Sequence, residues 1–236
     1  MQKPEQIEVI QITENVFQLT LPIVNVFLVD HPAGLMLIDT GPKGSKELIF
    51  EGIRHIGKQP EELKYIILTH AHYDHSGSLA AILEVADVPV YASALCAEMI
   101  KKGIAFQPES KFLAFLLRLV TLFGIIRLKF VFVQPIKSAV KIVQEGDQIP
   151  DANGLEVINA PGHTADQIAL FYPVKEALLF AADSVENTNK LKLPYAYQFA
   201  KISWQTFKKL ATFPFDIAVF GHGRAVSKSE FEKLVV

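Results

Sequence analysis

The chain has 236 residues, half of them apolar, which is enough for one large hydrophobic core, so we expect residues 1–236 to form a single domain. Its 23 basic and 25 acidic side chains nearly cancel, which excludes a general electrostatic attraction to nucleic acid or to an anionic membrane. One cysteine, no signal-peptide pattern and no uncharged apolar run of about 18 residues predict a cytoplasmic protein without a membrane span.

The predicted elements follow one another in a way that suits two β-sheets with helices on their outer faces. Short apolar runs between turn residues predict strands, and longer amphipathic stretches predict helices. In chain order, the expected strands are 7–12, 16–21, 24–30, 35–39, 63–69, 88–91, 140–143, 155–158, 168–172, 178–181 and, as the last, 217–220. The expected helices are 44–56, capped by Ser45, then 76–85, 92–101 and 203–211.

The segment after the predicted strand 63–69 reads H-A-H-Y-D-H and supplies His70, His72, Asp74 and His75. Three imidazoles and a carboxylate within six residues are poor material for a hydrophobic core. They are good ligands for zinc or a similar divalent ion. A solvated polar loop is the alternative interpretation, but such a loop has no need of histidine. The segment therefore predicts a metal site.

Three later segments each place a further candidate ligand directly after a predicted strand. These residues are His163, Asp183 and His222. Because several strands can aim the residues at their ends toward one point, we expect these side chains to join the H-A-H-Y-D-H segment. Six adjacent residues cannot complete two metal sites alone, so the later residues are required.

Together with L-I-D-T-G at residues 37–41, these motifs resemble those of the metallo-β-lactamase-fold hydrolase superfamily, in their order and approximate spacing. The resemblance covers essentially the whole chain, and we place it in the branch of lactonases and glyoxalase-II-like enzymes. It implies an α/β fold, a four-layer αββα sandwich of the metallo-β-lactamase type, here with a helical apolar insertion. It also implies a dinuclear metal centre.

The resemblance assigns a role to each of the eight candidate residues in this centre. The implied first metal site is His70, His72 and His163; the second is Asp74, His75 and His222; Asp183 bridges both metals with a water or hydroxide; and Asp39 is a buried carboxylate behind the ligands. Such a carboxylate can hold the outer ring nitrogen of a ligating imidazole. The mixed nitrogen and oxygen donors suit zinc first, with iron, manganese and cobalt as alternatives.

An unusual insertion, residues 101–137, separates the two halves of the ligand set. Its stretch 111–133 is apolar around most of a helix, and the insertion carries seven basic residues against one acid. Three interpretations stay open: a buried helix pair or homodimer surface, a lid over the site, or peripheral contact with a membrane. In the lid interpretation the insertion receives an apolar or acidic small molecule, and Phe115 and Leu119 set its size.

The resemblance, together with the chemistry of a water shared by two metals, implies a hydrolase in which a metal-bridging hydroxide attacks an ester, lactone or thioester carbonyl, with a lactone or carboxylic ester as the first choice. Asp74 and Asp183 are the predicted catalytic carboxylates, and Tyr195 and Tyr197 could polarise the substrate. Against a lactonase, the tyrosine that those enzymes place three residues beyond the bridging aspartate is Glu186 here.

Three other functions are compatible with the same residues. A metal-dependent phosphodiesterase would use the same ligands. A mononuclear-iron persulfide dioxygenase would use His70, His72, His163 and Asp183 alone. A metal-stabilised interaction module would not be an enzyme, and seven candidate ligands are more than it needs.

Overall fold

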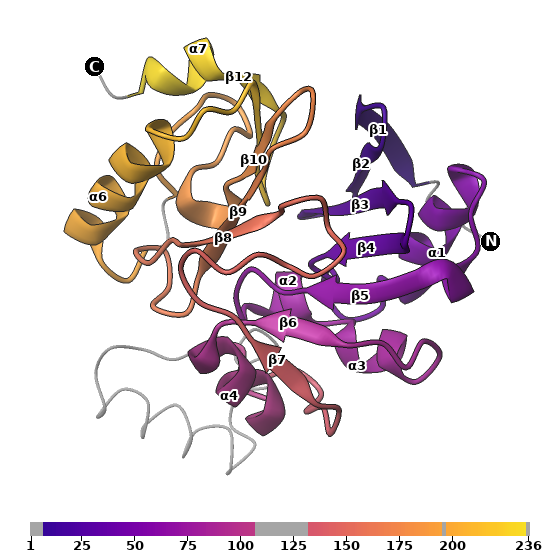
Figure 1. Ribbon diagram of the computed structural model, residues 1–236. Helices are drawn as coiled ribbons and strands as arrows, with labels where there is room; N and C mark the ends of the chain where they lie inside the picture. The colour runs from indigo at the N-terminus through magenta and orange to yellow at the C-terminus, as the bar shows by residue number, and fades with distance from the viewer. Residues whose placement is uncertain (1–6, 107–131, 195–196, 235–236) are drawn as a thin grey trace.

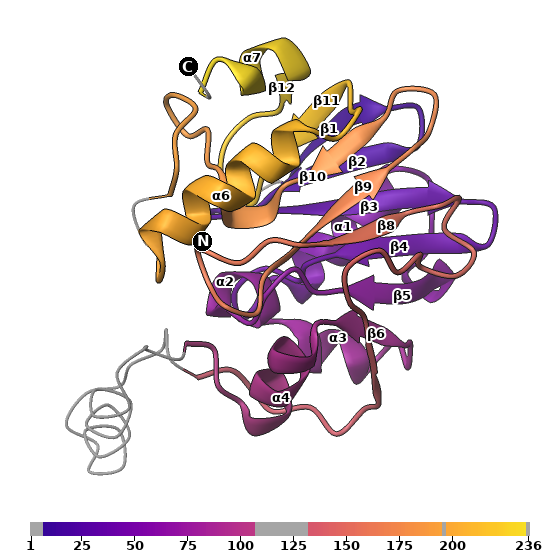
Figure 2. The same cartoon turned by 60° about the vertical axis from the view of Figure 1, so that its left-hand side comes forward.

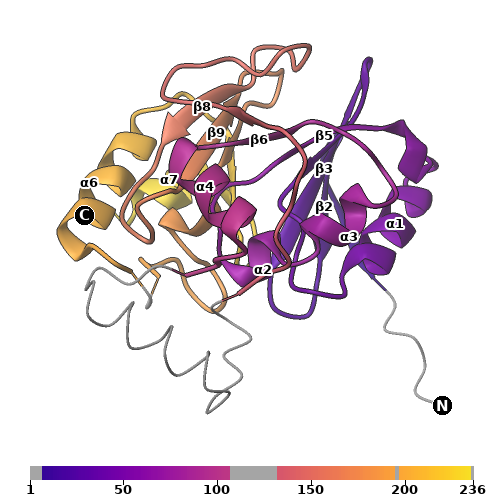
Figure 3. The same ribbon diagram turned by 90° about the horizontal axis from the view of Figure 1, so that it is seen from below.

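The computed structural model describes residues 7–106, 132–194 and 197–234. Two β-sheets pack face to face, and helices cover the outer face of each (Figures 1 and 3). In Figure 3 the order of the layers can be followed from α6, through the two sheets, to α3 and α1. The predicted α/β fold with two sheets and outer helices is confirmed.

The first sheet has seven strands, ordered β1-β2-β3-β4-β5-β6-β7 from edge to edge. They are β1 Glu8–Thr13, β2 Val16–Thr20, β3 Asn25–His31, β4 Gly34–Ile38, β5 Leu63–Ile67, β6 Val90–Ala92 and β7 Val140–Ile142. Neighbours from β1 to β4 are antiparallel, whereas β4 to β7 are parallel to one another. The carboxyl ends of β4 and β5 therefore lie at the same edge of the sheet.

The second sheet has five strands, ordered β12-β11-β10-β9-β8. They are β8 Glu156–Asn159, β9 Ile168–Tyr172, β10 Leu178–Phe180, β11 Ile217–Val219 and β12 Val226–Ser227. β9 runs antiparallel to both β8 and β10, and β11 runs parallel to β10. Consequently β8, β10 and β11 all point the same way, and the residues that follow them leave the sheet at one edge.

The helices lie outside the sheets. They are α1 Lys46–His55, α2 Tyr73–Ser76, α3 Leu79–Leu83, α4 Ala94–Lys102, α6 Ala200–Ala211 and α7 Lys228–Glu232, with short 3-10 turns η1 Pro60–Glu62 and η2 Ala182–Ser184. Figure 2 shows α6 lying across the face of the second sheet. No helix in the described ranges is long and apolar enough to cross a membrane.

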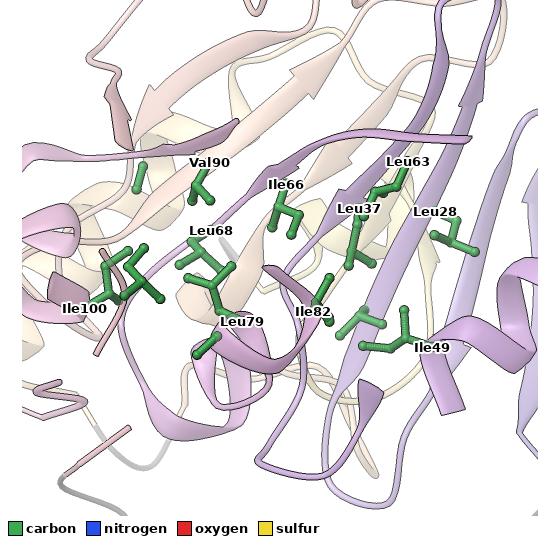
Figure 4. Packing of buried hydrophobic residues seen from close by; sticks show 14 of the residues in the cluster. Leu28, Leu37, Ile49, Leu63, Ile66, Leu68, Leu79, Ile82, Val90 and Ile100 are labelled. Atoms are coloured by element: carbon green, nitrogen blue, oxygen red, sulfur yellow. The ribbon is translucent and has the colours of Figure 1, made fainter. Parts of the chain in front are cut away.

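Three hydrophobic layers hold this sandwich together. The layer between the first sheet and α1, α3 and α4 includes Leu37, Ile49 and Ile82 (Figure 4). Between the sheets, Phe27 packs edge-to-face on Phe180 with ring centroids 5.4 Å apart. A third layer lies between the second sheet and α6 and α7. Burial on both faces explains why the strands read as nearly continuous apolar runs.

The predicted helix 76–85 is wrong as a single element, because it is broken between α2 and α3 at Gly77 and Ser78. A Cβ atom on Gly77 would lie 2.5 Å from the backbone nitrogen of Lys43, so only glycine fits there. Ser78 donates its hydroxyl to the carbonyl of Pro42 at 2.5 Å and accepts from the backbone nitrogen of Ser45. These long-range contacts replace the continuous helical hydrogen-bond ladder.

Two smaller predictions also need correction. The strand 217–220 is not the last, because β12 pairs antiparallel with β11 and α7 follows it. Ser45 does occupy the N-cap position of α1, but its hydroxyl makes no capping hydrogen bond. The backbone nitrogen of Ser45 donates to the hydroxyl of Ser78, and this hydrogen bond ties the start of α1 to the break between α2 and α3.

The described ends of the insertion 101–137 lie beside each other. Ile104 forms an antiparallel bridge with Phe132, and the backbone nitrogen of Val133 donates to the carbonyl of Gly103. The insertion therefore leaves and rejoins the sandwich at one place, next to the end of α4. Phe115 and Leu119 lie outside the described residues, so the lid, dimer and membrane interpretations stay predictions.

Candidate metal centre

The parallel strand directions bring every candidate ligand to one end of the sandwich. Asp39 follows β4, and the H-A-H-Y-D-H segment follows β5 and continues into α2. From the second sheet, His163 follows β8, Asp183 lies in η2 after β10, and His222 follows β11. Since β8, β10 and β11 are parallel, these three residues leave the sheet at the edge that faces the ends of β4 and β5.

The candidate side chains form three groups whose ligand atoms lie within 4.8 Å of one another. The groups are His70, His72 and His163; His70, His75 and Asp183; and Asp74, His75 and His222. The first and third are the two triplets that the resemblance implied. All seven expected ligands are thus brought together.

The distances inside these groups match those between ligands of a shared ion. His72 Nδ1 and His163 Nε2 are 3.0 Å apart. Two ligands about 2.0–2.1 Å from a tetrahedral ion are separated by about 3.3 Å. In the other triplet, Asp74 Oδ2 lies 3.5 Å from His222 Nε2.

Asp183 lies between the two triplets. Its Oδ2 is 3.2 Å from Nε2 of His222, 3.4 Å from Nε2 of both His75 and His163, and 4.0 Å from Nε2 of His70. One carboxylate oxygen thus approaches histidines of both triplets. This is the position that a bridging ligand would need.

Buried polar atoms without partners test whether the residues fit metal ions. Nε2 of His70, Nε2 of His75 and Oδ1 of Asp183 are buried, and none has a hydrogen-bond partner. Leaving such atoms unpaired costs about 1–3 kcal/mol each, so buried groups of this kind normally have a partner. Metal ions would satisfy all three. The His and Asp clusters therefore fit a binuclear metal site.

Asp39 contacts the candidate ligands from behind, on the side away from the centre. Its Oδ2 lies 2.8 Å from His75 Nδ1 and accepts the Thr69 hydroxyl at 2.8 Å, while its Oδ1 accepts the Thr69 backbone nitrogen. The Thr69 hydroxyl is in turn 3.0 Å from His70 Nδ1. Asp39 thereby fixes both imidazoles, directly and through Thr69, with their Nε2 atoms facing the centre.

We predict that Asp39→Asn keeps the fold but weakens metal affinity or activity by about 10–100-fold, the usual effect of losing a partner behind a ligand. The Asp39 carboxylate accepts three hydrogen bonds through its two oxygens. Asparagine has only one side-chain oxygen, so the NH2 group of the substituted side chain would face a hydrogen-bond donor. Metal content and kcat/KM should be compared with Asp30→Asn, which alters a surface ion pair with Lys58. Wild-type metal content and rate in folded Asp39→Asn would show that Asp39 has no such role.

The protonation states of the imidazoles differ across the cluster. Burial lowers the pKa of His70 well below its usual value and that of His72 to about 3, so both are neutral, as ligands must be. Burial also disfavours the charged form of His75 and His222. The charge of Asp183, however, raises the pKa of both, with help from Asp39 at His75.

Metal affinity should fall as the pH falls. His75 and His222 must lose a proton to bind a metal, and because their pKa is raised, protons compete with the metal up to higher pH than for an ordinary histidine. Each displaced proton changes the apparent affinity by about tenfold per pH unit in the range where it titrates. Metal titrations between pH 5 and 8 test this, and an affinity independent of pH would contradict it.

Two residues next to the cluster have left-handed backbone conformations. Asp39 has φ 61° and Ala182, directly before Asp183, has φ 49°. Such conformations are unusual for residues other than glycine, and alanine, unlike aspartate, has no side-chain hydrogen bond to offset the cost. The sharp turns they create direct Asp39 and Asp183 into the centre.

The sequence did not reveal the contacts by which several residues position the centre, although Asn25 was a possible cleft or turn residue. Asp166 is buried, and its Oδ2 accepts the backbone nitrogen of Ala71, between the first two histidines. Asn25 donates its amide to the carbonyls of Phe220 and Gly223, on either side of His222. Of these two residues, only Asp166 could have been identified from the sequence as a positioning residue, because it follows the candidate ligand His163 by three residues.

The structure describes only one of the two tyrosines that were predicted to contact the substrate. Tyr195 lies outside the described residues. Tyr197 is 46% exposed and precedes Gln198, whose backbone nitrogen donates to the carbonyl of His163, so its segment adjoins the centre. At the start of the insertion, the ring of Phe106 lies 6.0 Å from that of His72.

Comparison with known proteins agrees with the fold and the centre. A family model described as the metallo-beta-lactamase superfamily matches residues 19–222, from β2 to His222. The chain is 30% identical over 187 residues to the probable metallo-hydrolase YflN of Bacillus subtilis, covering 76% of this chain and 67% of that protein. It is 27% identical over 135 residues to a hydroxyacylglutathione hydrolase of Hahella chejuensis, covering 56% and 38%.

Among solved structures, a motif variant of a metallo-beta-lactamase from Cronobacter sakazakii superimposes with a TM-score of 0.70. The match covers 93% of this chain and 81% of that one, at 22% sequence identity, and shows the shared fold. The family match spans every candidate ligand and Asp39. The chain therefore belongs to the metallo-beta-lactamase superfamily and is one of its metal-dependent hydrolases.

Proposed function

We propose that this protein hydrolyses the carbonyl of a small-molecule ester, lactone or thioester, with carboxylic esters and lactones first. The observation that carries the proposal is the position of Asp183 Oδ2, within 3.2–4.0 Å of four histidine nitrogens that belong to both triplets. Two metal ions held there, zinc by preference, would supply a water deprotonated near neutral pH and would polarise the carbonyl oxygen.

The chain's own residues divide the remaining work. His70, His72 and His163 would hold one ion, and Asp74, His75 and His222 the other, with Asp183 between them. Asp74 belongs to the more exposed triplet, with its side chain 14% exposed and that of His222 22% exposed. Substrate would therefore enter from this side, where the Asp74 carboxylate can take a proton from the attacking water and pass it to the leaving group.

A hydroxyacylglutathione hydrolase among the relatives supports hydrolysis at a carbonyl carbon. Glu186 bears on the choice between esters and lactones. Its carboxylate pairs with Lys192 at 2.7 Å, so this position does not offer the hydroxyl that lactonases place there. The pair favours an open ester over a lactone ring. The single buried cysteine, Cys96, suits the cytoplasm, which we propose as the location.

The mononuclear-iron alternative needs only one triplet and Asp183. The second triplet, Asp74, His75 and His222, is also assembled, and a single-iron enzyme would have no use for it. A phosphodiesterase would use both triplets in the same way, so substrate tests are needed to separate it from an esterase.

The test is a substrate panel with the metal-loaded protein. We expect carboxylic esters or lactones to be hydrolysed at least tenfold faster, in kcat/KM, than matched phosphodiesters, with thioesters between them. Metal removal by a chelator should abolish turnover, and zinc should restore it. Preferred hydrolysis of a phosphodiester, or oxygen consumption with a persulfide, would replace the proposal with one of the two alternatives.

A further inference from the structure

A surface groove lies beside His222 of the more exposed triplet. It has a volume of about 330 Å³ and is lined by His222, Arg224 and Thr188 on one side. The opposite wall comes from β1, β2 and the loop that joins β2 to β3. A volume of this size is at the low end of that of small-molecule pockets. Because His222 is a candidate ligand and lines the groove, the groove lies beside the metal centre.

The groove has firmly connected walls. Asn25 donates its backbone nitrogen to the carbonyl of Gly221 at 2.7 Å and its side-chain amide to that of Gly223, also at 2.7 Å. Asn187 donates its backbone nitrogen to the carbonyl of His222 and its side chain to that of Arg224. These bonds fix the 221–224 turn against both the β2–β3 loop and the loop after Asp183, so the groove is a formed feature of the fold.

Two large apolar side chains are exposed in this groove. Ile10 of β1 is 39% exposed, and Ile23 of the β2–β3 loop is 47% exposed. Ile10 pairs with Gln18, which lies on the same side of β2 as Val16, a member of the layer between the sheets. Ile10 thus continues the inner apolar face beyond the core, where a ligand can cover it.

Arg224 supplies a positive charge in the same groove, and it makes no ion pair with an acid of the described residues. The charge reaches Glu230 only as a weak long-range effect. A guanidinium binds a carboxylate in a planar, two-bond arrangement. Glu8 of β1 also lines the groove, and its negative charge would repel an anion from that part of the groove. Charge therefore directs a carboxylate toward Arg224.

From these features we infer that the groove binds an amphipathic carboxylate, with its aliphatic arm on Ile10 and Ile23 and its anionic end on Arg224. The inference rests on the proposed function and names its substrate class: an ester whose chain ends in a carboxylate. The water oxygen bonds to the ester carbonyl carbon and the bond from that carbon to the alkoxy oxygen breaks; one proton of the water goes to the leaving alcohol and the other to solvent, so the products are a dicarboxylate, an alcohol and a proton.

The test compares two esters that differ only in charge: the mono-4-nitrophenyl ester of suberic acid and the same ester with its free carboxylate methylated. The ratio of kcat/KM for the acidic to the neutral ester is the readout. Arg224→Gln should lower this ratio about tenfold, mainly by raising KM for the acidic ester. A tenfold effect is at the low end of the range for a hydrogen bond to a charged group, because the site is exposed. Glu8→Gln should raise the ratio, and Arg54→Gln, an exposed residue of α1, should leave it unchanged.

An equal ratio in wild type and Arg224→Gln, or a lower ratio in Glu8→Gln, would overturn the inference. A second readout separates it from the proposed function. Octanesulfonate carries an alkyl chain of similar length and the same single negative charge and is a weak metal ligand, so its binding to the metal-loaded protein can be titrated without turnover. If neither these two esters nor any ester, lactone or thioester of the substrate panel is hydrolysed, the proposed function fails. The groove inference then stands if Arg224→Gln weakens octanesulfonate binding about tenfold, and falls if binding is equal or absent.

Discussion

Asp183→Ala is expected to lower the metal content of the protein from two ions per chain to less than one, with loss of hydrolysis by more than about 100-fold. The physical reason is its position, since Oδ2 approaches four histidine nitrogens, and within the described part of the chain no other carboxylate joins groups with histidines of both triplets. A loss beyond 100-fold exceeds the upper end for residues that act behind a ligand. Metal analysis and kcat/KM on the same sample give both values.

Asp87→Ala is the matched control for this variant. Asp87 is an exposed acid in the loop before β6, and its replacement should change neither metal content nor rate. Unfolding curves show whether Asp183→Ala is folded. A folded Asp183→Ala protein that keeps both ions and its activity would refute the bridging role.

Gly221→Ala is expected to lower activity by about 100-fold while leaving the fold intact. A Cβ atom at this position would lie 2.2 Å from Asp183 Oδ1 and 2.7 Å from His75 Cε1. Contacts this short force both side chains to move, and a displacement of about 1 Å in a catalytic site can cost about 100-fold in rate. Metal affinity and kcat/KM, with a circular dichroism spectrum as the test of folding, measure the effect.

Gly57→Ala separates this displacement from a general loss of stability. Gly57 follows α1, has φ 78°, and has open space around the added Cβ. Its replacement therefore introduces backbone strain of about 1–2 kcal/mol without touching the centre. Normal turnover in Gly57→Ala together with normal turnover in Gly221→Ala would mean that the 221 position tolerates the extra carbon and that the predicted geometry is wrong.

The sequence pattern predicted that the candidate ligands gather at one place, because they follow apolar runs, whereas their division into two triplets came from the family resemblance. His163, Asp183 and His222 follow β8, β10 and β11, and parallel strand directions then place them together. The break between α2 and α3 could not be predicted in this way. It depends on the contact of Gly77 with the backbone of Pro42 and Lys43, which are more than thirty residues away in the chain.

The contacts that position the centre could not be predicted either, because they also join segments that lie far apart in the chain. Asn25 binds carbonyls about 195 residues later in the chain, and Gly221 is required because of the place of Asp183. Neither requirement leaves a pattern in the local sequence. Local periodicity therefore predicts which residues stand at the strand ends, whereas packing between distant segments decides which backbone positions must be small or hydrogen-bonded.

The number of metal ions per chain, measured in the active protein together with their separation by X-ray absorption, tests the central claim most directly. The assembled triplets and the position of Asp183 predict two ions, roughly 3.5 Å apart, with activity that rises only when both are bound. One ion per chain in fully active protein, with no second metal neighbour in the absorption spectrum, would contradict it.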